Sequence, residues 1–114
     1  MKAPLRVKAR KRPALSARER AMMKRNAGDA AALLKTLANR NRLLLLCTLV
    51  EEESSVGALA TRLALSQSAV SQHLALLRRD GTVEARRDAQ TVYYRLRDPR
   101  VAALIETLYA QFCG

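Results

Sequence analysis

The sequence has few of the side chains that catalytic and metal-binding sites require. Its 114 residues include one histidine, two cysteines and no tryptophan, and no two of these three possible metal ligands are near each other in sequence. A tetrahedral metal site therefore lacks clustered ligands, and a thiol enzyme lacks a C-x-x-C pair. Because a chain of this length forms a single domain, we expect a binding protein that uses no metal or cofactor and is not an enzyme.

Acidic residues are scarce as well. The chain has 10 of them against 21 lysines and arginines, which gives a net charge of +11, and ten of the basic residues lie within residues 1–25. Such an excess indicates a partner that carries phosphates or presents an anionic surface. A block of like charge without an apolar run is typical of disorder. We therefore predict that residues 1–16 form a disordered basic arm, which either samples phosphates or acts as a passive solubilising tail.

Long hydrophobic runs are missing too. The first residues contain no apolar stretch of the length that a secretion signal needs, about 7 to 15 residues. No run in the sequence approaches the roughly 20 apolar residues of a membrane-spanning helix. We therefore expect a cytoplasmic protein without a membrane partner.

The apolar residues that are present become dense between Ala30 and Val50. The segments AALLKTLAN and RLLLLCTLVEEE are separated by the polar residues 39–42, which predicts two helices with a short break. The second segment is apolar around nearly its whole circumference, a pattern that favours a central helix buried on several sides. Cys47 lies within this segment, so we expect its side chain to be buried.

The next segment, SSVGALATRLALSQSAVSQHLALLRRDGTV, has the pattern of two short helices joined by a tight turn. Ser54 or Ser55 can cap the first helix and Ser66 the second, and such a pair forms a helix-turn-helix. One face of the second helix is small and polar, as a reader of base edges in a major groove requires. An ordinary amphipathic helix is the alternative, although its polar face usually carries Lys and Glu. The predicted DNA-contacting residues are Ser66, Gln67, Ser68, Ser71 and Gln72.

Alternating apolar residues follow in TVEARRDAQTVYYRLRD and predict a β-hairpin with a charged tip. A hairpin that follows a recognition helix is the wing of a winged helix, so its polar side chains are expected to reach DNA phosphates or a minor groove. The wing residues expected to do so are Arg86, Arg87 and Gln90. The tip contains no glycine, and Asp88 is the residue there that tolerates a positive φ.

The segment DPRVAALIETLYAQFCG predicts a final helix, capped by Asp98 with Pro99 in its first turn. Its apolar stripe is too wide for a helix that faces water. A twofold homodimer would bury this stripe, and packing against the helix's own domain is the alternative. The predicted interface residues are Leu104, Ile105, Leu108, Tyr109 and Phe112. Residues 17–114 are thus expected to form one mainly α winged helix-turn-helix domain with a small β-hairpin, in the order four helices, two strands, one helix, with dimerisation helices at both ends.

These segments resemble a known family. LLKTLANRNRLLLL, LALSQSAVSQHLALLRRDGTVEARRDAQTVYYRL and the closing helix, over about residues 30–114, are similar to the ArsR/SmtB family of dimeric winged-helix repressors. The resemblance implies a homodimer that binds inverted-repeat operator DNA and leaves it when an inducer binds. Family metal sites use clustered cysteines in the first helix of the DNA-binding motif, or Asp and His on the last helix. Neither set is present here, so we expect no metal. The residues that carry the resemblance include Ser71, His73, Leu74, Leu77, Gly81 and Val83.

The two cysteines, Cys47 and Cys113, are 66 positions apart. Their spacing and the segments LLLLCTL and YAQFCG resemble the branch of the family that senses persulfide or other reactive sulfur species. This resemblance implies that the two thiols become linked within one subunit, by reactive sulfur or another oxidant, and that the operator is then released. The alternatives are a metal- or haem-responsive repressor, or a nonspecific DNA-binding protein whose cysteines are structural.

Overall fold

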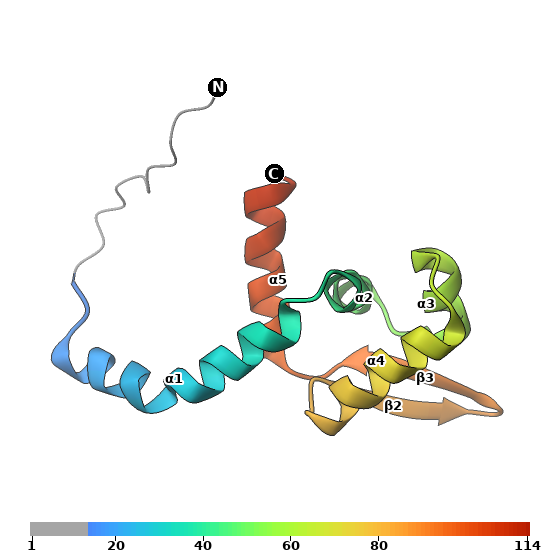
Figure 1. Ribbon diagram of the computed structural model, residues 1–114, viewed down its shortest axis with the longest axis horizontal. Coiled ribbons are helices and arrows are strands. Elements are labelled where there is room, and N and C mark those ends of the chain that lie inside the picture. Colours follow the sequence, from blue (N-terminus) through green and yellow to red (C-terminus); the bar gives the residue numbers. More distant parts are fainter. Residues whose placement is uncertain (1–13) are drawn as a thin grey trace. The chain divides into compact units, whose positions relative to one another are not determined.

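The computed structural model describes residues 14–114 (Figure 1). Within these residues the predicted order of helices and hairpin is confirmed, with one short strand added. The predicted basic arm, residues 1–16, lies almost entirely outside the described part of the chain. The elements are α1 (Ala17–Leu37), α2 (Arg40–Glu51), β1 (Ser54–Ser55), α3 (Val56–Leu63), α4 (Gln67–Arg79), β2 (Val83–Asp88), β3 (Thr91–Leu96) and α5 (Pro99–Phe112).

The chain divides into two compact units, residues 1–31 and 32–114, and α1 spans their boundary. In the first unit a capping box begins α1. The Glu19 backbone N–H donates to Ser16 Oγ at 3.0 Å, and the Ser16 N–H donates to Glu19 Oε1 at 2.9 Å. Both Met22 and Met23 are exposed, so the described part of this unit leaves apolar surface uncovered.

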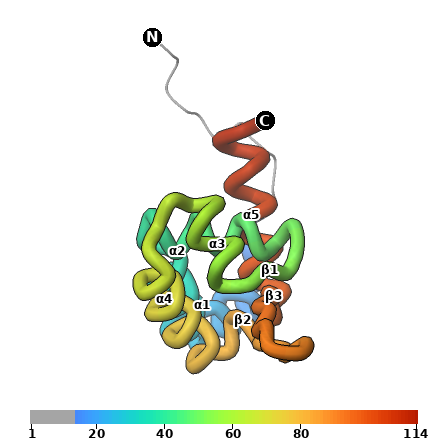
Figure 2. The backbone as a smooth tube through the Cα atoms, turned by 90° about the vertical axis from the view of Figure 1, so that its right-hand side faces the viewer, coloured from blue at the N-terminus to red at the C-terminus, as the bar shows by residue number. Residues whose placement is uncertain are grey.

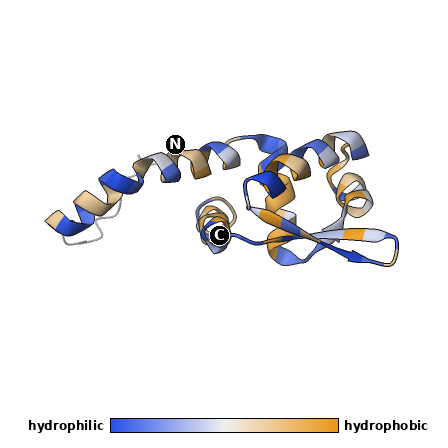
Figure 3. Cartoon of the chain, turned by 90° about the horizontal axis from the view of Figure 1, so that it is seen from below, coloured by the Kyte–Doolittle hydropathy of each residue, from blue (hydrophilic) through white to orange (hydrophobic). Residues whose placement is uncertain are grey.

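The second unit is built around α2. Asn39 caps this helix by accepting a hydrogen bond from the Arg42 N–H at 3.0 Å, which explains the break predicted at residues 39–42. Leu45 and Leu46 are fully buried. Their core contains residues from every helix and from β2, and the hairpin tip is hydrophilic (Figure 3). The buried apolar residues are Leu37, Leu45, Leu46, Leu49, Leu59, Ala60, Val70, Leu74, Leu77, Val83, Val101 and Ile105.

Burial of α2 is less complete than its composition predicted. Leu44 is exposed and Cys47 is only half-buried. The prediction that Cys47 is buried is therefore wrong. Neighbouring elements cover one side of the helix, and Cys47 lies at the border of that side, where it packs against the edge of the core.

The helix-turn-helix is confirmed as α3 and α4. Ser55 caps α3 by accepting from the Ala58 N–H, and Ser66 caps α4 by accepting from the Ala69 N–H at 3.0 Å. The turn between them is left-handed at Ala64, whose φ is 56°. There the Leu65 N–H donates to the Ala60 carbonyl and the Ala64 N–H donates to the Thr61 carbonyl, which satisfies the last carbonyls of α3.

The strands form one antiparallel sheet in the order β1-β3-β2. Strand β1 was not predicted, because two residues are too short to show an alternating pattern. Hairpin β2–β3 lies beside α4 (Figures 1 and 2). The structure settles the turn, which the sequence left open: Asp88 pairs with Thr91, and the residue with the positive φ is Ala89, at 58°.

Helix α5 is only partly available to a second chain. Asp98 caps it, as predicted, by accepting from the Arg100 N–H at 2.9 Å. Ile105 is fully buried in the core of its own chain, so its assignment to the dimer interface is wrong, and the alternative of packing on the same domain holds for this part of the stripe. In contrast, Leu104, Leu108 and Tyr109 are half-buried and Phe112 is 82% exposed.

A first prediction concerns the turn at Ala64. A left-handed conformation costs a non-glycine residue about 1 to 2 kcal/mol, and glycine adds an entropic cost of about 0.5 to 1 kcal/mol. Replacing Ala64 with glycine should therefore raise the free energy of unfolding by up to about 1 kcal/mol, measured by urea denaturation at fixed protein concentration. Ala75→Gly, at an exposed position inside α4, should instead lower it by about 0.5 to 1 kcal/mol. Equal losses in both variants would contradict the left-handed turn.

Candidate nucleic-acid interface and thiol pair

Helix α4 separates its polar and apolar faces as the sequence predicted. Gln67, Ser68, Ser71 and Gln72 are all exposed. On the opposite face, Val70, Leu74 and Leu77 are fully buried. The uncharged polar side chains therefore lie on the exposed face of a helix whose opposite face packs into the core. Ser66 is also exposed, but its Oγ already accepts the capping hydrogen bond from the backbone, which makes it primarily the residue that starts this helix.

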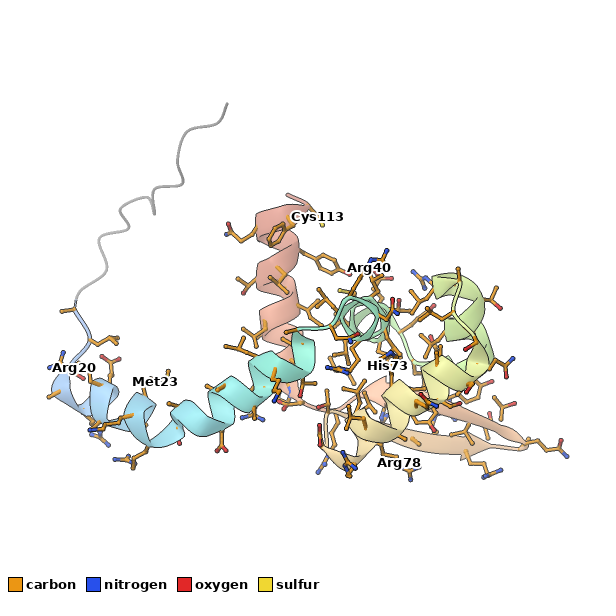
Figure 4. All side chains as sticks on the ribbon, in the orientation of Figure 1. Arg20, Met23, Arg40, His73, Arg78 and Cys113 are labelled. Atoms are coloured by element: carbon orange, nitrogen blue, oxygen red, sulfur yellow. The ribbon has the colours of Figure 1, made fainter. Side chains whose placement is uncertain are left out.

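His73 lies on the inner side of α4, toward α2 (Figure 4). Its side chain is half-buried, and burial lowers its pKa below the usual value of 6.5, with a further lowering by the positive charge of Arg42. His73 therefore does not share the exposed face of the helix and packs beside the core.

The two wing arginines that were predicted together have different surroundings. Successive residues of a strand point to opposite faces. Arg86 donates from Nε to Glu53 Oε1 at 3.0 Å and from Nη2 to the same carboxylate, and its guanidinium lies 5.0 Å from the centre of the Tyr93 ring. This hydrogen bonding lowers the pKa of Glu53 and raises that of Arg86. The Arg86 guanidinium is therefore engaged within the chain.

Arg87 lies on the opposite face of β2 from Arg86. It lines a surface hollow of about 140 Å³ together with Arg78, Ala85, Arg86 and Val92. The sequence did not lead us to name Arg78 as a candidate DNA contact. The signal that could have identified it is the pair of basic residues in the last turn of α4, within LLRRDG. Gln90 is exposed at the hairpin turn. The hollow thus connects the predicted reading helix with the predicted wing.

The two cysteines are free thiols on neighbouring elements of one chain. Cys47 is half-buried on α2, whereas Cys113 is exposed and caps the end of α5, where Figure 4 labels it. Helices α2 and α5 contact each other. The Cys113 backbone N–H donates to the Tyr109 carbonyl at 2.8 Å, so the last turn of α5 connects the exposed thiol to Tyr109.

Tyr109 is close to both thiols. A hydrogen bond with Cys47 is the largest cause that raises the pKa of Tyr109 to about 12, followed by burial. The charges of Cys47, Glu51 and Cys113 raise it further. A hydrogen bond forms only between atoms that are close together. The Tyr109 side chain of α5 therefore lies beside Cys47 of α2.

Two further features are absent from the described residues. No helix among them is long and apolar enough to cross a membrane. Within the same residues, no group of three or more His, Cys, Asp or Glu side chains is placed to hold a metal ion.

A second prediction tests the contact between Tyr109 and Cys47. In the reduced protein, the ring signals of Tyr109 in an NMR titration should report ionisation near pH 12. Cys47→Ala should return this pKa toward the ordinary value of 10.0, since it removes the largest contribution. Cys113→Ala is the matched control and should change the Tyr109 pKa less. A titration that is the same in the parent and in Cys47→Ala would show that the two side chains are not in contact.

Comparison with known proteins places the chain in a family. The family described as "Bacterial regulatory protein, arsR family" matches residues 39–85. The transcriptional activator HlyU of Vibrio cholerae serotype O1 is 54% identical over 91 residues, which cover 80% of this chain and 84% of that protein. The structure of reduced HlyU from Vibrio cholerae superposes with a TM-score of 0.76 at 53% identity, over 82% of this chain and 98% of the other.

Two further solved structures are similar. The transcriptional repressor BigR of Xylella fastidiosa has a TM-score of 0.79 and 44% identity, over 83% of this chain and 97% of the other. A homodimeric winged helix-turn-helix DNA-binding domain from Mycobacterium bovis, from a possible ArsR-family regulator, has a TM-score of 0.65 and 32% identity, over 87% and 88%. The chain therefore has the winged helix-turn-helix fold and belongs to the ArsR family of bacterial transcriptional regulators.

Proposed function

We propose that the protein is a cytoplasmic homodimeric repressor that binds an inverted-repeat operator and releases it when Cys47 and Cys113 of one subunit are linked by reactive sulfur. The proposal that the protein binds DNA depends on one observation, the separation of α4 into a polar face and an apolar face. Uncharged hydrogen-bonding side chains are exposed on one face, while the other face is buried in the core. A rigid helix with such a face can enter a major groove and read base edges.

The dimer is supported by the apolar surface that remains on α5. Phe112 is 82% exposed, and Leu108 and Tyr109 are half-buried in the single chain. A second copy of the same helix would cover these side chains through a twofold axis. The similar domain from Mycobacterium bovis is described as homodimeric. A twofold dimer presents two reading helices, which is why the operator is expected to be an inverted repeat.

The sensing part is supported by the position of the two thiols around Tyr109 in one chain. A direct disulfide needs Cα atoms about 5.5 Å apart, whereas a bridge with inserted sulfur spans a longer gap. An organic polysulfide supplies both the inserted sulfur and the oxidising equivalents. Each thiol exchanges its S–H bond for an S–S bond, and the two ends of the polysulfide leave as thiols. The solved HlyU relative is described as reduced, which is the state expected here to bind DNA.

The bridge would act through the helices that carry it. It would tie α2 to the end of α5, the helix whose exposed stripe is assigned to the dimer. A change in the dimer changes the spacing of the two reading helices, which must match successive major grooves. Losing a hundredfold in affinity needs only about 2.7 kcal/mol of coupling.

A third prediction tests base reading. Gln72→Ala should weaken binding to the operator by about 1 to 3 kcal/mol and change binding to random DNA little, since amide contacts to base edges carry sequence information. Fluorescence anisotropy with both duplexes measures this difference. Gln111→Ala, an exposed glutamine on α5, should affect neither. An equal loss on operator and random DNA would remove Gln72 from the reading set.

A fourth prediction tests the thiols. Cys47→Ser and Cys113→Ser should each bind operator like the parent and stay bound after polysulfide treatment, because one thiol cannot form the bridge. The parent should lose affinity by about a hundredfold, recover it with a thiol reductant, and gain whole sulfur atoms in mass beyond a plain disulfide. Release of DNA by the double serine variant would show that the cysteines are not the sensor.

A further inference from the structure

The arginines of residues 62–114 fall into two groups, those paired with a carboxylate and those without such a partner. Residues 62–114 contain eight arginines, and five of them have a carboxylate within 4.0 Å. These pairs are Arg62 with Glu51, Arg86 with Glu53, Arg95 and Arg97 with Glu84, and Arg100 with Asp98. Among the described residues, no carboxylate pairs with Arg78, Arg79 or Arg87.

Only two of these three unpaired arginines share a site. Arg78, in the last turn of α4, and Arg87, on β2, line the same hollow of about 140 Å³. Figure 4 shows Arg78 at the end of α4 beside the hairpin. Arg79 is the next residue of the helix and does not line the hollow. Arg86 also lines it, but its guanidinium is bound to Glu53 and stacked on Tyr93.

We propose that Arg78 and Arg87 together bind one backbone phosphate of DNA in this hollow. The assignment rests on the proposed DNA-binding function and adds a specific contact to it. Arg78 and Arg87 line one hollow and no carboxylate of the described residues pairs with either, so their positive charges repel each other. A phosphodiester relieves this repulsion, because its two charged oxygens match the planar donor forks of both arginines.

The position of the hollow explains why a DNA phosphate is the expected anion. The reading residues Gln67, Ser68, Ser71 and Gln72 occupy the first half of α4, and Arg78 follows two turns later on the same helix. A phosphate bound by Arg78 of α4 and Arg87 of β2 would fix the angle between the helix and the wing. The first half of α4 would contact bases at the same time. Both arginines are exposed. A free anion would therefore bind them weakly, because water already solvates their charges. DNA supplies the phosphate together with all its other contacts.

The experiment replaces single phosphates of the operator with uncharged methylphosphonates, one position at a time in each half-site. At one position the parent should bind roughly three- to tenfold more weakly. At that position Arg78→Ala and Arg87→Ala should each show a smaller loss than the parent, because one of the two arginines still contacts the phosphate, and the double alanine variant should show none. The double variant should also reduce the slope of log affinity against log salt by about 0.9, which corresponds to one phosphate. Circular dichroism confirms that each variant is folded.

Arg79→Ala and Arg86→Ala are the matched controls. Arg79 is a neighbouring unpaired arginine outside the hollow, and Arg86 is a lining residue whose guanidinium is engaged. Both controls should keep the parent's sensitivity to the same methylphosphonate. If Arg79→Ala loses this sensitivity as Arg78→Ala does, or if no position separates Arg78→Ala from the parent, the proposed site is wrong.

Measurements on the same proteins can also give two results that would overturn the proposal. If inorganic phosphate shifts the side-chain NMR signals of Arg78 and Arg87 at millimolar concentration while every methylphosphonate is silent, the pair is a small-anion site and the DNA assignment is overturned. If the folded parent binds no DNA, the proposed function itself fails, and the phosphate site fails with it. A smaller methylphosphonate effect in each single variant and none in the double variant, with both controls unchanged, supports the site.

Discussion

The burial of one side of α2 is the constraint on which the rest of the second unit depends. Leu45 and Leu46 are fully buried and Leu49 nearly so, and each contributes about 1.5 to 3 kcal/mol through removal from water. Their packing fixes the rotation of the helix. With about 100° between successive residues, Cys47 is then placed at the border of the core, beside Tyr109 of α5. The location of the thiol is therefore set by the leucines around it.

The same helix is also tied to the helix-turn-helix and to the wing. Glu51 and Glu52 at its end pair with Arg62 of α3, at 3.2 and 3.7 Å. Glu53, just beyond the helix, pairs with Arg86 of the wing. A displacement of α2 must either break these ion pairs or carry α3 and the wing with it. The chain thus contains a continuous set of contacts from the thiol helix to α3 and to the wing, of the kind that can carry coupling between distant sites.

The sequence was sufficient for features that depend on local spacing. The cap residues Ser66 and Asp98, together with the divided faces of α4, could be predicted because each depends on residues within about one helical turn. Contacts between distant segments could not. The Arg86–Glu53 pair joins residues 33 positions apart, and Ile105 is buried by residues of other helices. Strand β1 forms only because Ser54 and Ser55 pair with Tyr94 and Tyr93.

Net charge alone is a poor guide to where such a protein meets DNA. Carboxylates within the chain neutralise five of the eight arginines after residue 61, so these charges contribute little to binding phosphates. The unpaired arginines lie at the end of α4 and on β2, next to the uncharged face of the same helix. In the proposed interface, base reading, which discriminates sequences, is assigned to the first half of α4, and phosphate contact, which depends on salt, is assigned to Arg78 at the end of this helix and to Arg87 on β2. Substitutions can then change specificity and affinity separately, because the core that holds α4 in place is common to both.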